Sequence, residues 1–338
     1  MRAYIVPAGC KTSDELRMVE RPDPKPGPCQ VLVRIRAVSL NYRDQAIALG
    51  TYFGGTVARD TIPLSDGAGE VAAVGSGVTG FKPGDRVMGL FSQVPSDGPA
   101  FGDRAALGGP LDGMLAEYVV VYEDGVIAIP AAVSFEQAAC LPCAGVTAWH
   151  ALMYAGRPVR AGDTVLVLGT GGVSILALQF AKATGARVIA TSSSDEKIAR
   201  VLTLGASDGI NYQRTPDWDR QVMKLTDGRG VDCVVEVGGV GTLNRSFQAL
   251  AFGGKAVLIG LLTGQNGEVN PYALMPKWGS LHGIFVGDRG MFESMNQAID
   301  AHGIKPVVDK IFPFDEALSA YQLHASGRFF GKVVIRVS

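Results

Sequence analysis

The sequence predicts an α/β protein with two domains: a doubly wound parallel sheet flanked by helices, and a smaller β-rich domain. At 338 residues the chain is long for a single hydrophobic core, so two domains are the default. Residues 1–125 read as short strands broken by turns, whereas strands and helices alternate from residue 164 onward. The final strand-like stretch, 331–337, resembles the first region, so we expect the chain to return to the β-rich domain.

Composition and charge argue against several classes of function. The chain is 47% hydrophobic and 19% charged with a net charge of −1, so we expect no binding to nucleic acid or to an anionic membrane. No apolar run approaches ~18 residues, and the first residues already have a strand-like pattern, so we expect neither a spanning helix nor a signal peptide. The odd number of scattered cysteines argues against a disulfide framework and favours a cytoplasmic location: Cys10, Cys29, Cys140, Cys143 and Cys233.

The β-rich region has the pattern of a small antiparallel barrel. Short strands are expected over 30–38, 69–75 and 85–89, with glycine-rich turn chemistry between the last two. A long loop rich in Gly, Pro, Ser and Asp covers 91–110. Loops of that length usually form a lid or an interface, or here replace a metal-binding lobe.

Helices begin where this region ends. Ser134 and Gln137 have the spacing of a capping box, which predicts a helix start, and a second helix is expected over 146–154. Beyond residue 164 the expected strands are 164–168, 186–192, 207–211, 231–237 and 255–260, and the expected helices are 196–204, 218–225, 243–250 and 291–302.

A glycine turn after the strand 164–168 carries the clearest functional signal. Gly169 allows the tight turn, and Gly171 lets a pyrophosphate approach the backbone without a Cβ in the way. The helix that opens at Gly172 and Val173 points free N–H groups and its positive dipole end at such an anion. The next strand completes a βαβ unit, and Ser174 stands where the full pattern has a third glycine or an alanine. The sequence therefore predicts a Rossmann dinucleotide site.

The end of the second strand favours NADP over NAD. No carboxylate follows until Asp195, although an acid about 20 positions past the glycines would be needed to bind the adenosine ribose of NAD. Ser192 and Ser193 can donate to a 2′-phosphate, Lys197 can neutralise it, and Tyr212 follows the next strand. The alternative, serines that cap the helix and a solvated Lys197, is compatible with that role.

Several motifs together resemble the medium-chain dehydrogenase/reductase family. They are 67–75, 84–89, 141–149, the Rossmann turn, 230–236 and 331–335. The resemblance implies a GroES-like catalytic domain over 1–144 and 286–338, with a Rossmann domain over 145–285 inserted before the last segment.

The positions of the catalytic zinc ligands in zinc-dependent relatives fall on Asn41, Ser65 and Cys143. Only the third is a competent ligand, whereas a catalytic zinc needs three protein donors. The loop 91–110, where a structural zinc lobe would lie, contains no cysteine. We therefore expect no zinc. The Cys140–Cys143 pair is interpreted as small packing residues, and the four histidines are expected to be structural or solvated.

The segment 37–44 is similar to the zinc-free branch of quinone, alkenal and enoyl reductases. In that branch an asparagine and a tyrosine at the positions of Asn41 and Tyr52 line the substrate pocket. The candidate catalytic residues are Asn41, Tyr42, Asp44 and Tyr52, because side-chain donors must stabilise a developing oxyanion where no metal does so. Alternatively, Asp44 pairs with Arg43 as a strut for the loop.

The resemblance also implies further cofactor contacts. Thr147 matches the residue that contacts the nicotinamide carboxamide, and Lys332 is expected at the pyrophosphate or a ribose. The backbone expected to line the cofactor groove belongs to Gly238, Gly260, Leu261, Phe285 and Val286.

These observations predict a zinc-independent, NADPH-dependent oxidoreductase. Its expected partner is a small carbonyl, enone or quinone, to which a hydride is transferred. An alcohol dehydrogenase or carbonyl reductase on the same fold is the alternative enzyme, and an NADPH-binding sensor is the alternative without catalysis. The resemblance implies a homodimer, formed by pairing of Rossmann sheet edges.

Overall fold

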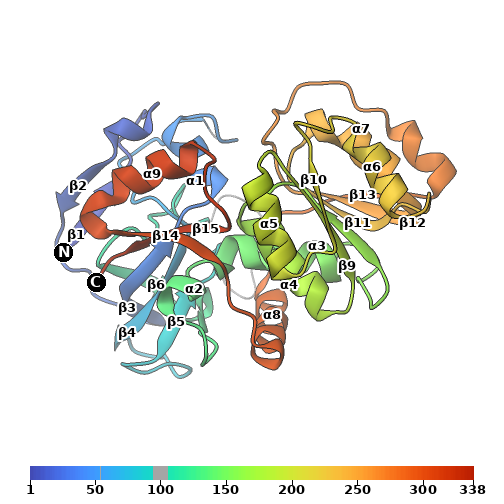
Figure 1. The fold of residues 1–338 in the computed structure, drawn as a ribbon. Helices are drawn as coiled ribbons and strands as arrows, with labels where there is room; N and C mark the ends of the chain where they lie inside the picture. Colours follow the sequence, from blue (N-terminus) through green and yellow to red (C-terminus); the bar gives the residue numbers. More distant parts are fainter. Residues whose placement is uncertain (54, 94–105) are drawn as a thin grey trace. The chain divides into compact units, whose positions relative to one another are not determined.

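The computed structural model describes residues 1–53, 55–93 and 106–338. The chain forms two compact units, Met1–Ala144 with Asp288–Ser338, and Gly145–Gly287 (Figure 1). Part of the loop expected over 91–110 lies outside the described residues.

The first unit is built on a mostly antiparallel sheet. Its order is β14-β15-β3-β4-β5-β7, with β6 also paired to β3, and β1 and β2 form a separate pair. The strands are β1 Arg2–Ile5, β2 Arg17–Glu20, β3 Gln30–Ser39, β4 Asp66–Val74, β5 Arg86–Gly89, β6 Tyr118–Tyr122, β7 Val126–Ala128, β14 Val308–Pro313 and β15 Lys332–Arg336.

The central strand β3 shows why this sheet forms. Val31, Val33 and Ile35 alternate along it and are buried, so one face packs on the core while the other carries polar residues. The C-terminal strand β15 pairs antiparallel with β3, with Ile335 opposite Val38, which returns the end of the chain to this unit.

Helices complete the first unit. They are η1 Ser13–Glu15, α1 Tyr42–Ala48, η3 Glu123–Gly125, α2 Phe135–Ala138, α8 Arg289–His302, η6 Phe314–Glu316 and α9 Ala317–Ala325. The predicted capping box is confirmed, because Gln137 N donates to Ser134 Oγ and Ser134 N to Gln137 Oε1, at 3.3 and 3.1 Å. A π-helical turn, η4 Leu141–Gly145, follows α2.

The second unit has a parallel sheet with the strand order of a Rossmann fold, β10-β9-β8-β11-β12-β13. Its strands are β8 Thr164–Val167, β9 Arg187–Ser192, β10 Asp208–Asn211, β11 Val231–Glu236, β12 Leu250–Leu258 and β13 Ser280–Gly283. Its helices are α3 Val146–Met153, α4 Gly172–Ala183, α5 Asp195–Leu204, α6 Trp218–Leu225, α7 Val240–Ala249 and η5 Pro271–Lys277. Strands β8 and β11 are buried along their whole length, as is typical of a parallel sheet covered on both faces.

The chain leaves the second unit slightly later than the expected residue 286. Val286 has a φ of 45°, and its carbonyl oxygen is 2.9 Å from Nδ1 of His150 on α3. This contact keeps Val286 in the second unit. The return begins at Asp288, whose carboxylate caps α8 by accepting from Met291 N.

None of the helices in the described part of the chain is long and apolar enough to cross a membrane.

Candidate functional site

The glycine turn after β8 leaves room for a ligand. Gly169 has a φ of +72°, a region that favours glycine, whereas Gly171 has a φ of −78° that any residue can adopt. A Cβ built on either glycine would meet no protein atom within 4 Å. The packing of the protein itself therefore does not require a bare Cα at Gly171, but an approaching phosphate would.

The helix behind this turn can bind an anion. α4 begins at Gly172, and no side chain caps its N-terminus, so the first N–H groups of the helix remain available to a ligand. Ser174 fits the third glycine position because it is buried and its hydroxyl donates to Leu168 O at 2.6 Å. The turn lies at the carboxyl end of β8, where the strand order reverses toward β11 and dinucleotides bind in this fold.

The residues predicted to select the dinucleotide converge at the ends of β9 and β10. Asn211 pairs with Ser192 in the sheet, and Tyr212 N donates to Ser192 O at 3.0 Å. Ser192 Oγ accepts from Ser194 N, so part of the capping alternative is also present. Ser193 is half-buried, and the ring of Tyr212 is 40% exposed.

The carboxylate of Asp195 is occupied by protein partners. Asn211 Nδ2 donates to Asp195 Oδ1 at 2.7 Å, and the guanidinium of Arg214 forms an ion pair with Oδ2. Both oxygens are therefore engaged and are poorly placed to accept from a ribose diol.

A buried acid missed in the sequence shapes the loop after β11. Glu236 accepts hydrogen bonds from Gly238 N at 2.8 Å, Gly239 N at 3.1 Å and Thr242 Oγ1 at 2.6 Å. Gly238 O in turn accepts from Thr263 Oγ1 at 2.8 Å. The polar groups of Gly238 are thus used within the protein. An acid at the end of a mostly apolar strand was the signal that could have revealed Glu236.

The other predicted cofactor residues differ in their burial and in their contacts with the protein. A Cβ on Gly260 would lie 2.1 Å from Val237 O, so glycine is required there by the close approach of two loops. Thr147 is buried on α3, and the Val286 carbonyl is bound by His150. Leu261 is half-buried and Phe285 is 37% exposed.

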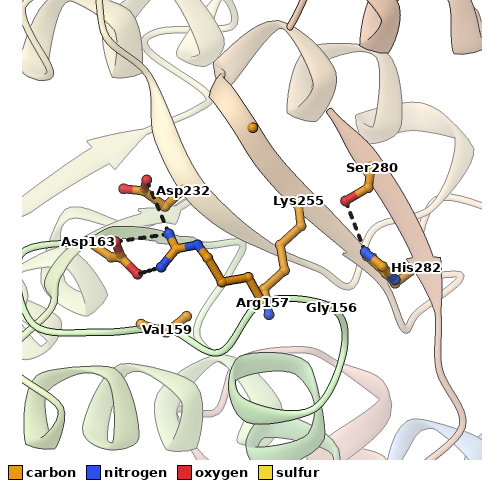
Figure 2. Close-up of a pocket in the computed structure, with 9 residues that line it drawn as sticks. Gly156, Arg157, Val159, Asp163, Asp232, Lys255, Ser280 and His282 are labelled. Atoms are coloured by element: carbon orange, nitrogen blue, oxygen red, sulfur yellow. Dashed lines mark hydrogen bonds and ion pairs between the residues drawn. The ribbon is translucent and has the colours of Figure 1, made fainter. Parts of the chain in front are cut away.

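A hollow in this unit lies near the amino ends of β8, β11 and β13, and Figure 2 shows the residues that line it. It measures about 230 Å³, and its charged groups are paired within the protein: Arg157 contacts Asp163 at 2.9 Å and Asp232 at 3.6 Å. Lys255 Nζ donates to three carbonyl oxygens at the end of α3 and in the turn that follows. These groups stabilise the base of the sheet, so we do not assign the hollow to the nucleotide.

In the first unit, the two polar atoms of the candidate catalytic residue Asn41 differ in their hydrogen bonding. Asn41 Oδ1 accepts from Lys332 Nζ at 2.6 Å. Asn41 Nδ2 is buried and has no hydrogen-bond partner among the residues that the structure describes. Buried donors are normally paired, so an orphaned amide N–H₂ points to a ligand that accepts from it.

Lys332, which was predicted to contact the pyrophosphate or a ribose, has its ammonium group in this cluster. Its side chain is 4% exposed, and Nζ donates to Leu40 O as well as to Asn41 Oδ1, both at 2.6 Å. Asp66 Oδ2 is 3.9 Å from the ammonium. The hydrogen bonds of Lys332 are thus made to the end of β3 and the start of α1.

Asp44, a candidate catalytic residue, caps α1 with its carboxylate. Asp44 Oδ2 accepts from Asn41 N at 2.7 Å, and Asp44 Oδ1 lies 3.8 Å from Arg43 Nη1. Burial raises the pKa of Asp44 from 3.8 to about 6, against the opposing charge of Arg43. The strut alternative fits better than a direct catalytic role.

Arg43 connects this helix to the loop around Gly109. Its guanidinium donates to Leu107 O at 2.8 Å and to Gly109 O at 2.9 Å. The ring of Tyr52 lies 5.2 Å and that of Phe91 4.8 Å from the Arg43 guanidinium carbon, so Tyr52 packs against Arg43. Tyr42, in contrast, is 51% exposed at the start of α1.

Two family models match the chain. One is described as an alcohol dehydrogenase GroES-like domain and covers residues 27–131; the other is described as zinc-binding dehydrogenase and covers 172–301. A zinc-type alcohol dehydrogenase-like protein of Schizosaccharomyces pombe is 42% identical over 99% of both chains. The chain belongs to the medium-chain dehydrogenase/reductase superfamily.

Other members of the superfamily carry different names. The quinone oxidoreductase of Rattus norvegicus is 30% identical over 92% of this chain and 90% of its own. A solved NAD-dependent alcohol dehydrogenase is 34% identical, with a TM-score of 0.91 and coverage of 100% of both chains. As a member of this superfamily the chain is an NAD(P)-dependent oxidoreductase with a small-molecule substrate. This favours the enzyme over the non-catalytic NADPH-binding protein.

The superfamily includes zinc enzymes, but the donors at the corresponding positions do not fit zinc. Asn41 Oδ1 faces the ammonium of Lys332, and Ser65 Oγ donates to Asp66 Oδ1 at 2.7 Å. No group of three His, Cys, Asp or Glu residues suited to a metal occurs within residues 1–53, 55–93 and 106–338.

Proposed function

We propose that the protein is a zinc-independent, NADPH-dependent reductase of α,β-unsaturated carbonyls or quinones. The observation that carries this proposal is the buried, unpartnered Nδ2 of Asn41, whose Oδ1 is held by Lys332. A fixed donor with no partner in the described protein suits an oxygen that becomes negative during the reaction.

The chemistry requires little more than such a donor and a proton. A bound NADPH would supply a hydride to the β-carbon of the substrate. The C=C electron pair then moves toward the carbonyl, and negative charge develops on its oxygen, where the Asn41 amide donates. A proton from Tyr42, Tyr52 or water completes the reduction at the α-carbon. The half-exposed Tyr42 can exchange its proton with solvent.

Three features support NADPH over NADH. Both oxygens of Asp195 are engaged by Asn211 and Arg214. Tyr212 and Ser192 lie side by side at the ends of neighbouring strands. Lys197 stands in the first turn of α5 and can add a positive charge beside a 2′-phosphate.

A carbonyl reductase or alcohol dehydrogenase is the second candidate, because the Schizosaccharomyces pombe relative carries a zinc-type alcohol dehydrogenase-like name. A 2-enal offers both targets in one molecule, so NADPH oxidation with product identification separates the two. A saturated aldehyde supports the alkene reductase, whereas an allylic alcohol supports the carbonyl reductase. If only quinones are reduced, the alkene substrate class is wrong. Zinc bound stoichiometrically after purification would contradict zinc independence.

We also infer a homodimer through the edge of the Rossmann sheet. β13 pairs only with β12 among the described strands, so its other edge is open to a second copy. Exposed apolar side chains lie on β13, on its neighbour β12 and on the segment that leads into β13: Phe252 67%, Tyr272 74%, Met275 69%, Trp278 77% and Leu281 40%. Such a patch is typical of an interface. Light scattering of the wild type and of Trp278→Ser tests this proposal, since a monomeric wild type contradicts it.

We also infer a reducing, cytoplasmic location, which rests on the odd number and the scatter of the five cysteines in the sequence.

A further inference from the structure

The amide of Asn41 is oriented by a buried ammonium group. We propose that Lys332 is a positioning residue that fixes the Asn41 side chain with its N–H₂ toward the substrate oxygen. This inference rests on the proposed function, because it explains how the donor of that reaction is held in place.

The hydrogen-bonding groups of Lys332 and Asn41 allow only one orientation of the Asn41 amide. An ammonium group only donates hydrogen bonds, so at 2.6 Å it must face the oxygen of the Asn41 amide and not its nitrogen. The nitrogen is thereby turned away from Lys332. In agreement with this, Nδ2 is the atom of Asn41 that lacks a partner in the described structure.

Lys332 is itself held on several sides. Nζ donates to Leu40 O, and Asp66 Oδ2 lies 3.9 Å away. Asp66 is fixed in turn by the hydroxyl of Ser65 and by Cys143 N, at 2.7 and 3.2 Å. The ammonium therefore belongs to a buried network that joins β4, η4 and β15.

A neighbouring histidine, His324, adds no second positive charge to this network. His324 is half-buried, and desolvation, aided by the positive charge of Lys332, lowers the pKa of His324 to about 3. The imidazole thus stays neutral beside the ammonium.

Removal of Lys332 would release the amide. Without the ammonium, the Asn41 side chain can turn and present Oδ1 to the substrate, which repels an oxygen that gains negative charge. Because this contact strengthens in the transition state, the loss should fall on kcat and spare KM.

A double-mutant cycle distinguishes a Lys332 that acts through Asn41 from a Lys332 that affects the rate independently. We expect Lys332→Met and Asn41→Ala each to lower kcat about 100-fold, the size typical of one lost oxyanion donor. If Lys332 acts through Asn41, the double variant is about as slow as Asn41→Ala alone. Multiplied losses in the double variant would overturn the proposal. If Lys332→Met does not fold, Lys332→Gln takes its place, since its amide can both donate and accept.

Two isosteric or conservative variants serve as controls. Asn41→Asp keeps an acceptor for Lys332 but offers no N–H, so it should fold and bind NADPH like the wild type while losing kcat as Asn41→Ala does. Lys332→Arg keeps a group that only donates and should recover part of the rate lost in Lys332→Met. An active Asn41→Asp, or no recovery in a folded Lys332→Arg, would contradict the proposal.

NMR of the Asn41 side chain requires no catalysis, so it tests the positioning role of Lys332 whatever the substrate is. In protein labelled with ¹⁵N-asparagine, the Asn41 side-chain signals, assigned by their loss in Asn41→Ser, should be sharp in the wild type. We expect them to broaden or split in folded Lys332→Met, because the amide is no longer held. Unchanged signals would overturn the positioning role even if no substrate is found, whereas changed signals without any enal or quinone reduction would refute only the proposed function.

Discussion

The nucleotide turn is made of neighbours in sequence, Gly169 to Ser174, whereas the polar cluster around Asn41 joins residues from four distant segments. In the turn, backbone geometry and an uncapped helix create the site locally. In the cluster, Asn41, Asp66, Cys143 and Lys332 meet only because β3, β4, η4 and β15 fold together. A local motif can be recognised from its spacing, but a long-range cluster shows its contacts only in the folded structure.

The largest expected effect concerns the local site. Gly171→Val should raise the Kd for NADPH at least ~100-fold, because a side chain there blocks the approach of the pyrophosphate to the backbone. The fold should be unaffected, since Gly171 has an ordinary φ and a Cβ meets no protein atom. Fluorescence titration with NADPH and the melting temperature measure both effects. Unaltered binding would remove Gly171 from the cofactor site.

Gly260→Ala is the matched variant in which stability should fall. Its Cβ would lie 2.1 Å from Val237 O, so the loops must move apart, at a cost of ~3 kcal/mol in the free energy of unfolding. Urea denaturation measures this loss. If the variant is as stable as the wild type but binds NADPH poorly, Gly260 belongs to the cofactor groove and not to the packing of the loops.

The pH dependence of the free energy of unfolding, compared between the wild type and Asp44→Asn, tests the polar cluster around Asn41. Burial raises the pKa of Asp44 from 3.8 to about 6, so the folded state binds the proton more tightly than the unfolded state. The resulting stabilisation is complete below pH 3.8 and is lost as the pH rises through 6. The wild type should therefore lose ~2 kcal/mol of unfolding free energy over this window, and Asp44→Asn should lack this loss. Parallel stability curves for the two proteins would contradict the raised pKa.

Lys197→Ala has the smallest expected effect and tests which dinucleotide is used. Loss of one charge beside the 2′-phosphate should weaken NADPH binding ~10-fold and leave NADH little changed. Direct titration with both cofactors measures the ratio. Equal losses for the two would show that Lys197 contributes nothing to selection of the phosphate.

Individual residues show how far the sequence could be interpreted. The capping box at Ser134 and Gln137 and the turn at Gly169 are local patterns, and the structure contains both. Glu236 was missed because its partners, Thr242 and the N–H groups of two glycines, reveal themselves only when the loop folds back. Helix α9 and strands β13 and β14 were also not predicted, since their short segments have little periodicity of their own.

By itself the sequence predicted the alternation of strands and helices, the glycine turn and the resemblance to the superfamily, because each depends on periodicity or on motifs within short segments. Only the tertiary structure decided that Lys332 binds Asn41, that Asp44 caps α1, and that Asn41 Nδ2 is left without a partner among the described residues. The hydrogen bond between Asn41 and Lys332 joins residues that are 291 positions apart. The local pattern around either residue does not predict this hydrogen bond. The two residues meet because β15 pairs with β3.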